Sequence, residues 1–319
     1  MDHPQLVTIF GGSGFVGTQV VQLLARAGFR IRVAVRRPDL SLHLKPLGAV
    51  GQVALIQANV RNADSVMAAV RGADVVINLV GVGIERAKQR FRAVNVMGAT
   101  NVAAAAKKAG VNTLIHMSIL GADATNSSLF ARSRAMGEEA VRAAFPGAIV
   151  FRPSIIFGNG DDFFNLLGAL ARMLPVMPLF GGKTRFQPVY VGDVAEAIAA
   201  AAQGAAKPGK TYELGGPEVL THRQLVEMVL AETNRKRPIL PLPNLVGALL
   251  AIPMGLLPKP PVTGDQIKLL GRDNVVSAEA IKDKRTLAAF SITPRPLGAI
   301  LPSYLWRFSK HGQFDRQTA

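Results

Sequence analysis

Three glycines near the start of the chain, Gly11, Gly14 and Gly17, have the spacing of a phosphate-binding turn. Without a Cβ, glycine permits a tight turn at the first position, a close approach of a pyrophosphate at the second and close helix packing at the third. Free N–H groups at the start of a following helix favour the same negative charge. The pattern predicts a dinucleotide site formed by Gly11, Ser13, Gly14, Phe15, Val16 and Gly17.

The residues on either side of this turn support that prediction. Residues 6–10 are an apolar run typical of a buried strand, and apolar residues from 16 to 24 recur at helical spacing. The triplet reads G-x-x-G-x-x-G, which differs from the G-x-G-x-x-G of most dehydrogenases. Because glycine-rich turns are common, a purely structural turn is the alternative, but the strand before it and the helix after it favour a cofactor.

Two arginines, Arg36 and Arg37, follow the alternating segment 30–35, which is predicted to be the second strand. In folds that bind NAD an acidic residue at this point bonds the ribose 2′-OH, whereas arginine accommodates the 2′-phosphate of NADP. The first acidic residue here is Asp39. We therefore expect NADPH as the cofactor, with a solvated loop face as the alternative role for both arginines.

Further strand ends supply further candidates for the cofactor site. Residues 53–58 and 74–80 are predicted strands, and both are almost continuously apolar, as expected for parallel strands covered on both faces. Asn59 and Val60 would flank the adenine, and Leu79, Val80 and Gly81 would pass beside a ribose. Ordinary loop structure is the alternative for these five residues.

The elements alternate between strand and helix through the first 150 residues or so. Helices are expected at 63–71 and at the alanine-rich segment 95–109, and a fifth strand at 113–118. This alternation predicts an α/β fold with a doubly wound parallel sheet, a Rossmann fold. We expect an NADP(H)-binding domain at 1–155 and a smaller C-terminal lobe at 156–319. The lobe would cover the cofactor cleft, carry a docking segment and return some of its residues to the Rossmann core.

Composition limits the classes of function. The 319 residues include no cysteine and five scattered histidines, so we expect neither disulfides nor a metal site. The net charge of +16 indicates an anionic partner, which is nucleic acid, an anionic membrane surface or an acidic protein. The single Trp and three Tyr leave few side chains for base stacking, so nucleic acid is the weakest of the three candidates. The first strand begins a few residues after Met1, which predicts a bacterial cytoplasmic protein without a signal peptide.

From the fifth strand onward the chain resembles extended and atypical short-chain dehydrogenase/reductases. That family has a serine after this strand, matched by Ser118, and a Tyr-x-x-x-Lys dyad on the next helix. In the family the tyrosine exchanges the proton, while the lysine lowers its pKa and holds the nicotinamide ribose. Here the two dyad positions are Phe130 and Arg134, and no other tyrosine has a lysine four residues later.

Two later motifs, residues 150–162 and 186–195, resemble further fingerprints of this family. Taken with residues 118–122, the lost tyrosine and the basic charge, the chain resembles the NAD(P)H-binding accessory subunits of respiratory complex I. The resemblance implies a bound NADPH that serves stability or assembly, no catalytic residue, and contacts with other complex I subunits. It also places Ser118, Arg134 and Pro153 beside the cofactor. Acidic and basic residues of the two motifs, such as Arg152 and Asp161, are expected to form structural ion pairs and turns.

A proline-broken apolar segment lies between basic residues at 235–259. Its apolar core is shorter than the roughly 20 residues that span a bilayer, so we expect no transmembrane span. It is either a docking element, around residues 245–257, or buried core. Docking would place the protein peripherally on an anionic membrane surface, at the cytoplasmic face of the bacterial inner membrane.

Two other functions compete with the accessory-subunit interpretation. One is an active NAD(P)H-dependent reductase or nucleotide-sugar epimerase, and the other is a nucleotide sensor.

Overall fold

The computed structural model describes residues 4–247, 263–310 and 312. The chain forms two compact units, each assembled from separate stretches. Within the described residues, the first unit comprises 4–153, 191–214 and 277–293, and the second comprises 154–190, 215–247, 263–276, 294–310 and 312. The chain therefore leaves the first unit after Pro153 and returns to it twice.

A seven-stranded parallel sheet forms the centre of the first unit. The chain adds strands outward from β1 on one side and then resumes on the other side with β4, so the strand order reverses between β1 and β4. Such a reversal opens a crevice at the carboxyl ends of the two strands, where parallel sheets bind ligands. In spatial order the strands are β11 (Thr211–Leu214), β6 (Ile149–Pro153), β5 (Thr113–Met117), β4 (Val75–Asn78), β1 (Leu6–Phe10), β2 (Arg30–Val35) and β3 (Val53–Gln57).

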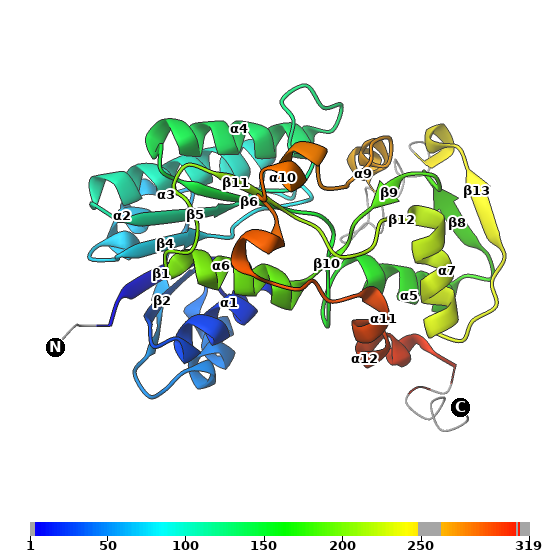
Figure 1. The fold of residues 1–319 in the computed structure, drawn as a ribbon, viewed down its shortest axis with the longest axis horizontal. Coiled ribbons are helices and arrows are strands. Elements are labelled where there is room, and N and C mark those ends of the chain that lie inside the picture. Colours follow the sequence, from blue (N-terminus) through cyan, green and yellow to red (C-terminus); the bar gives the residue numbers. More distant parts are fainter. Residues whose placement is uncertain (1–3, 248–262, 311, 313–319) are drawn as a thin grey trace. The chain divides into compact units, whose positions relative to one another are not determined.

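Helices cover both faces of this sheet (Figure 1). On one face lie α2 (Ala63–Val70), α3 (Met97–Lys108) and α4 (Leu129–Ala144), each packed on the next. On the other face α1 (Phe15–Arg26) packs on α6 (Val191–Ala202). The predicted doubly wound α/β fold is confirmed.

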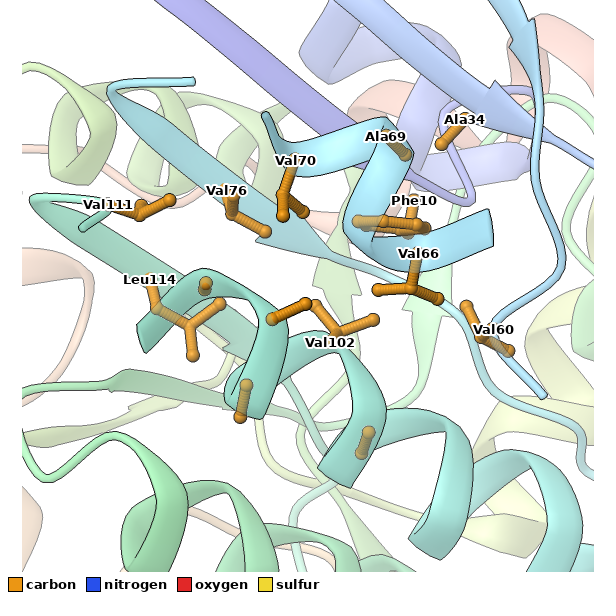
Figure 2. Packing of buried hydrophobic residues seen from close by; sticks show 14 of the residues in the cluster. Phe10, Ala34, Val60, Val66, Ala69, Val70, Val76, Val102, Val111 and Leu114 are labelled. Atoms are coloured by element: carbon orange, nitrogen blue, oxygen red, sulfur yellow. The ribbon is translucent and has the colours of Figure 1, made fainter. Parts of the chain in front are cut away.

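The core beneath α2 and α3 is formed by apolar residues of β1 and of both helices. Phe10 at the end of β1 lies in one buried cluster with Val66 of α2 and Val102 of α3 (Figure 2). The predicted alanine-rich helix supplies small buried side chains, so α3 approaches the sheet closely. A Cβ added to Gly98 would lie 2.9 Å from Val60 Cγ2, which shows how tightly the N-terminus of α3 packs at the end of β3.

The element bounds differ from the predictions mainly at one helix. The strands predicted at 53–58, 74–80 and 113–118 end up to two residues earlier than expected. The helix predicted at 95–109 is divided into a π-helical turn, η2 (Arg92–Val96), and α3. Asn95 lies in that turn, and its carboxamide exchanges hydrogen bonds with the backbone of Val82, at 2.9 and 3.1 Å. Single π-helical turns inside helices are often associated with functional sites.

The remaining elements of the first unit are short. A 3-10 segment, η1, contains a buried Ser41 and Leu44, and Phe290 of η3 packs 5.7 Å from Phe151 of β6 between ring centroids. These elements are η1 (Pro38–Leu47), α10 (Ala278–Lys282) and η3 (Leu287–Phe290).

The second unit has its own apolar core, around Phe157, Phe164, Met177 and Leu225. Helices α5 and α7 pack together, and β8 pairs in parallel with β13. The helices of this unit are α5 (Phe163–Met173), α7 (His222–Glu232), α9 (Gly264–Leu269), α11 (Leu297–Ile300), α12 (Pro302–Leu305) and η4 (Trp306–Phe308). The strands are β7 (Ile156–Phe157), β8 (Met177–Phe180), β9 (Arg185–Phe186), β10 (Val189–Tyr190), β12 (Leu220–Thr221) and β13 (Ile239–Leu242).

Charged residues of the later motifs have structural roles, as predicted. Arg152 donates from Nε and Nη2 to the two carboxylate oxygens of buried Glu138, at 2.9 and 2.7 Å. Asp161 accepts from the backbone N–H of Phe164 at 2.6 Å, at the start of α5, and from the hydroxyl of Tyr304 at 2.5 Å. Burial raises the pKa of the Asp161 carboxyl. The Arg152–Glu138 pair therefore links β6 to α4 within the first unit, and the Asp161 carboxyl links the start of α5 to α12 within the second.

Residues 248–257 of the predicted docking segment lie outside the described residues, and its first residues, Leu245 and Val246, are exposed. Within the described parts of the chain, none of the helices combines the length and the apolar character needed to cross a bilayer.

Candidate nucleotide-binding site

The turn between β1 and α1 depends on two of its glycines. Gly11 has a φ of 80°, which glycine adopts without strain, and a Cβ there would lie 3.2 Å from the backbone of Leu79 and Val80. A Cβ on Gly17 would lie 2.3 Å from the carbonyl oxygen of Gly11 and 2.6 Å from Gly12 Cα. The turn and the first turn of α1 are therefore packed backbone against backbone.

The N-terminus of α1 carries no capping side chain and no acidic residue in its first turn. The Gly14 N–H is used within the turn, where it donates to the Gly11 carbonyl at 3.1 Å. The first N–H groups of the helix, including those of Phe15 and Val16, have no partner within the helix itself. The positive end of the helix dipole is left without compensation at this point, as an anion site requires.

A cavity of about 290 Å³ opens beside this turn, at the carboxyl ends of β1, β2, β3 and β4. It lies where the strand order reverses, so the topology and the cavity agree. More than half of the predicted site residues line it, namely Gly11, Ser13, Gly14, Arg36, Asn59, Val60, Leu79, Val80 and Gly81. The other lining residues are Phe10, Ala34, Val35, Ala58, Arg61, Val82, Gln89 and Val94.

The remaining predicted residues do not line this cavity. The side chain of Val16 is buried in the core, Gly17 packs on the turn, and Phe15 is half-buried at the start of α1. Arg37 is exposed and pairs with Asp39, at 3.4 Å between Nη2 and Oδ2. Pro153 is the buried last residue of β6. Their predicted contacts with a cofactor stay predictions, as do those of Ser118 and Arg134.

Ser118 and Arg134 lie together at the carboxyl end of β5. Arg134 Nη2 donates to the carbonyl oxygens of Met117 and Ser118, at 3.1 and 3.3 Å, and Nη1 donates to that of Val80 at 3.5 Å. Burial lowers the pKa of Arg134 to about 10, so it is protonated at neutral pH. Among the described residues, the Ser118 hydroxyl and Arg134 Nε have no hydrogen-bond partner although both are buried. Orphaned polar atoms of this kind fit a polar group that is not part of the chain.

Phe130 fills the tyrosine position of the dyad with an aromatic contact. Its ring centroid lies 5.8 Å from that of buried Phe91 and 6.0 Å from Arg134 Cζ. Phe91 directly precedes the π-helical turn, so this contact holds the end of the loop after β4 against α4. A phenylalanine ring has no hydroxyl that could donate a proton to a substrate, and the guanidinium of Arg134 beside it already donates hydrogen bonds to main-chain carbonyls.

Two polar residues of the cavity were not predicted. Arg61 donates from Nε to Asn59 Oδ1 at 3.3 Å and from Nη1 to the Lys88 carbonyl at 3.1 Å. Gln89 comes from the loop after β4. Arg61 follows the third strand closely, and the rule that carboxyl ends of adjacent parallel strands meet at one edge would have found it. Gln89 has no comparable local signal.

A buried amide on β4 contacts a buried imidazole on β5 next to the cavity lining. Asn78 Nδ2 and His116 Nδ1 are 3.2 Å apart, and Asn78 Oδ1 accepts from the Val80 N–H at 3.1 Å. Burial, assisted by the charge of Arg134, lowers the pKa of His116 to about 3. The imidazole is therefore neutral at physiological pH, and Asn78 positions the backbone of a lining residue.

Comparison with known proteins agrees with this geometry. Residues 7–215 match the family described as "NAD dependent epimerase/dehydratase family". The chain belongs to the NAD dependent epimerase/dehydratase family. The match spans the whole cavity and β1 to β11, so the family assignment and the fold refer to the same part of the chain.

Within the NAD dependent epimerase/dehydratase family, the relatives include respiratory-chain proteins. The mitochondrial NADH dehydrogenase [ubiquinone] 1 alpha subcomplex subunit 9 of Arabidopsis thaliana is 35% identical over 96% of this chain and 79% of its own length. The predicted resemblance to complex I accessory subunits is confirmed at this level. The ceramide reductase of Caulobacter vibrioides (strain NA1000 / CB15N) is 34% identical over 62% of this chain and 61% of its own.

A solved structure supports the fold of this family member. The Escherichia coli NADPH-dependent quinone oxidoreductase QOR2, complexed with NADPH, has a TM-score of 0.73 over 92% of this chain and 97% of its own. Its identity to this chain is 18%, so the likeness concerns the fold.

Proposed function

We propose that this protein is a non-catalytic, NADPH-binding accessory subunit of respiratory complex I, in which the nucleotide stabilises the fold or the assembly. The observation that carries the proposal is the identity of 35% over 96% of the chain to a relative named as a complex I subunit. The predicted cofactor contacts, at the cavity lining and at Ser118, Arg134 and Pro153, are part of the proposal.

The choice of NADPH rests on the charge around the end of β2. Arg36 lines the cavity, and within the described chain no side chain or carbonyl is recorded as its partner. The acidic residue nearest in sequence, Asp39, does not line the cavity and is paired with Arg37. A 2′-phosphate would give exposed Arg36 a charge-assisted contact, whereas a 2′-OH would leave the guanidinium in contact with solvent.

The absence of turnover rests on Phe130 and Arg134. A hydride transfer to a carbonyl needs a proton donor beside the substrate, and Phe130 provides none. A bound nucleotide still stabilises the protein without reacting, by about 2.7 kcal/mol at 100 times its dissociation constant. The nucleotide then acts as a structural ligand.

The position of the protein in the cell follows from its partners. As a complex I subunit it would be bound to other subunits at the cytoplasmic face of the bacterial inner membrane. The net charge of +16 would favour peripheral contact with anionic headgroups.

Purification of the native protein under mild detergent tests the proposal. We expect complex I subunits to accompany it and bound NADPH to be released when it is denatured. When the native protein is incubated with NADPH and quinones or carbonyls, we expect no NADP⁺ to form. Multiple turnover of NADPH by the pure protein would overturn the non-catalytic assignment, and recovery without any complex I subunit would overturn the accessory role.

A second candidate function is a reductase acting on a lipid-like carbonyl, which is favoured by the relative named ceramide reductase. It predicts turnover with an oxidised ceramide as substrate. The same incubation, with that lipid in detergent, separates the two candidates.

A further inference from the structure

The loop after β4 presents basic side chains at alternate positions. Arg86, Lys88, Arg90 and Arg92 are all exposed. Between them, Gln89 lines the cavity and Phe91 is buried at 8% exposure. The loop therefore has an inner side, which faces the cavity and the core, and an outer side that is positively charged.

The loop backbone is held in a defined conformation. The Glu85 carboxylate accepts from the Phe91 N–H at 2.8 Å, and the backbones of Arg86 and Gln89 exchange hydrogen bonds of 3.1 and 2.7 Å. Ala87 at the tip has a φ of 43°, in the left-handed region that a non-glycine residue seldom adopts. The hydrogen bonds on either side of Ala87 offset the cost of this conformation, so they fix the positions of the basic side chains on the loop.

The basic residues of the outer side do not serve the cavity. The cationic residues that line it are Arg36 and Arg61, and none of the four basic loop residues belongs to its lining. Arg90 lies 3.6 Å from Glu85. For Arg86, Lys88 and Arg92, the part of the chain that the structure describes records no carboxylate within ion-pair distance.

The character of the loop selects a protein as the partner. A segment that enters a bilayer presents apolar or aromatic side chains, and single-stranded nucleic acid stacks on exposed aromatics. From 85 to 92 every residue is described, and Phe91, the one large apolar side chain, is buried. Guanidinium groups pair with carboxylates and with phosphates alike, but here they stand on a backbone fixed by the Glu85 and Gln89 hydrogen bonds. Cations at fixed positions are matched best by acidic groups that are also fixed, as on a folded protein surface, and less well by lipid headgroups that diffuse.

The loop is also connected to the nucleotide cavity. Arg61 lines the cavity and holds the Lys88 carbonyl at 3.1 Å, while Gln89 is itself part of the lining. A ligand that contacts these residues would favour the loop conformation seen here. By linkage, a partner bound to the outer side would then strengthen nucleotide binding by the same factor.

We propose that residues 85–92 form a docking loop for a carboxylate-rich face of a protein partner, and that nucleotide in the adjacent cavity stabilises its docking conformation. The inference rests on the proposed function for the identity of the assembly, but the docking loop itself is tested without it.

The test compares two triple charge reversals. The loop variant carries Arg86→Glu, Lys88→Glu and Arg92→Glu, and leaves Arg90 with Glu85. The control carries Lys45→Glu, Lys207→Glu and Lys210→Glu, which are exposed residues of the same unit. Both variants change the net charge equally, so a difference between them reports position and not total charge.

The first measurement is binding of poly-L-glutamate, used as the acidic probe, with and without NADPH. We expect the loop variant to lose affinity by about tenfold and the control by less than about threefold, and NADPH to strengthen binding only in the unmodified protein and the control. Equal losses in both variants would overturn the docking loop. An NADPH affinity that itself falls by tenfold in the loop variant would also overturn it, since the cations would then serve the nucleotide.

The second measurement is retention in complex I purified under mild detergent, with flotation on phosphatidylserine vesicles beside it. We expect the loop variant alone to be lost from the complex, and both variants to bind vesicles equally. Loss of vesicle binding in the loop variant with poly-L-glutamate binding unchanged would make the occupant a membrane and overturn the inference. If the unmodified protein is absent from complex I while the probe still requires the loop, the proposed function fails and the docking loop stands.

Discussion

Arg134 donates to the carbonyl oxygen of Ser118 at 3.3 Å, while the hydroxyl of the same serine has no hydrogen-bond partner among the described residues. The guanidinium reaches three backbone carbonyls at the ends of β4 and β5, which a single ammonium group cannot match in the same geometry. Arginine at this position therefore holds two strand ends together.

Arg134→Lys is predicted to destabilise the protein without creating activity. The loss of two or three charge-assisted contacts to buried carbonyls should cost about 1 to 3 kcal/mol. Urea denaturation measures this cost, and NADPH oxidation with a carbonyl substrate measures activity. The double variant Phe130→Tyr, Arg134→Lys is measured beside it, because it restores both residues of the dyad. Activity from the single lysine variant would contradict the structural role of Arg134.

Arg36→Ala is predicted to weaken NADPH binding by about tenfold or more and to leave NADH nearly unchanged, since a charge-assisted phosphate contact contributes about 1.5 to 3 kcal/mol. Arg37→Ala is the control, because Arg37 is paired with Asp39 and does not line the cavity. Titration of both variants with both nucleotides checks this. A larger effect of Arg37→Ala would reassign the phosphate contact.

Gly17→Ala is predicted to lower both the folded yield and nucleotide binding. Its Cβ would lie 2.3 Å from a carbonyl oxygen of the turn, and backbone on both sides leaves little room for relaxation. A Cβ on Gly83 would meet no atom within 4 Å, so Gly83→Ala should behave as the unmodified protein does. Thermal unfolding with and without NADPH is the measurement; equal behaviour of the two variants would refute the close packing.

His116 is predicted to make the protein sensitive to acid. Its pKa falls from 6.5 to about 3 on folding, so the unfolded chain binds more protons between these values. Stability from this residue is complete above pH 6.5 and decreases as the pH falls, by up to about 1.4 kcal/mol per unit. His116→Gln should remove this part of the slope, which urea denaturation at several pH values will show. An unchanged slope would mean that other groups carry the acid sensitivity.

Glu138 and Arg152 are predicted to be coupled. Glu138→Leu leaves Arg152 without its bidentate partner and should cost about 2 kcal/mol, less than for a fully buried pair because the arginine side chain is 28% exposed. Adding Arg152→Met should recover part of the loss, since the uncompensated charge is removed. A double-mutant cycle with no coupling energy would contradict the ion pair.

The first three elements were predictable because each has a local signal. Leu6–Phe10 and Arg30–Val35 have the bounds that the apolar run and the alternating segment predict, and the helix after Gly14 begins at the glycine turn. The strand ends around Asn59 and Leu79 reach the cavity because parallel strands in a doubly wound sheet end at one edge.

Other features depend on contacts that are distant in sequence. Gln89 enters the cavity through a loop fixed by Glu85 and by the Phe91 to Phe130 contact, neither of which local periodicity reveals. The π-helical turn at Asn95 depends on contacts to Val82, so a helix predicted from alanine content began at the wrong residue. Arg37 follows the same strand as Arg36 but is drawn to Asp39, and sequence alone gives the two equal weight.

The interleaving of the two units has a consequence for biosynthesis. Strand β11 and helix α6 belong to the first unit but are translated after residues 154–190 of the second, and residues 277–293 come later still. A chain that consists only of residues 1–153 would leave exposed the edge of β6 and the part of the sheet that α6 covers, although it already contains every residue of the cavity lining. The lining of the cavity proposed for the nucleotide is therefore fully translated before the sheet that carries it has its last strand.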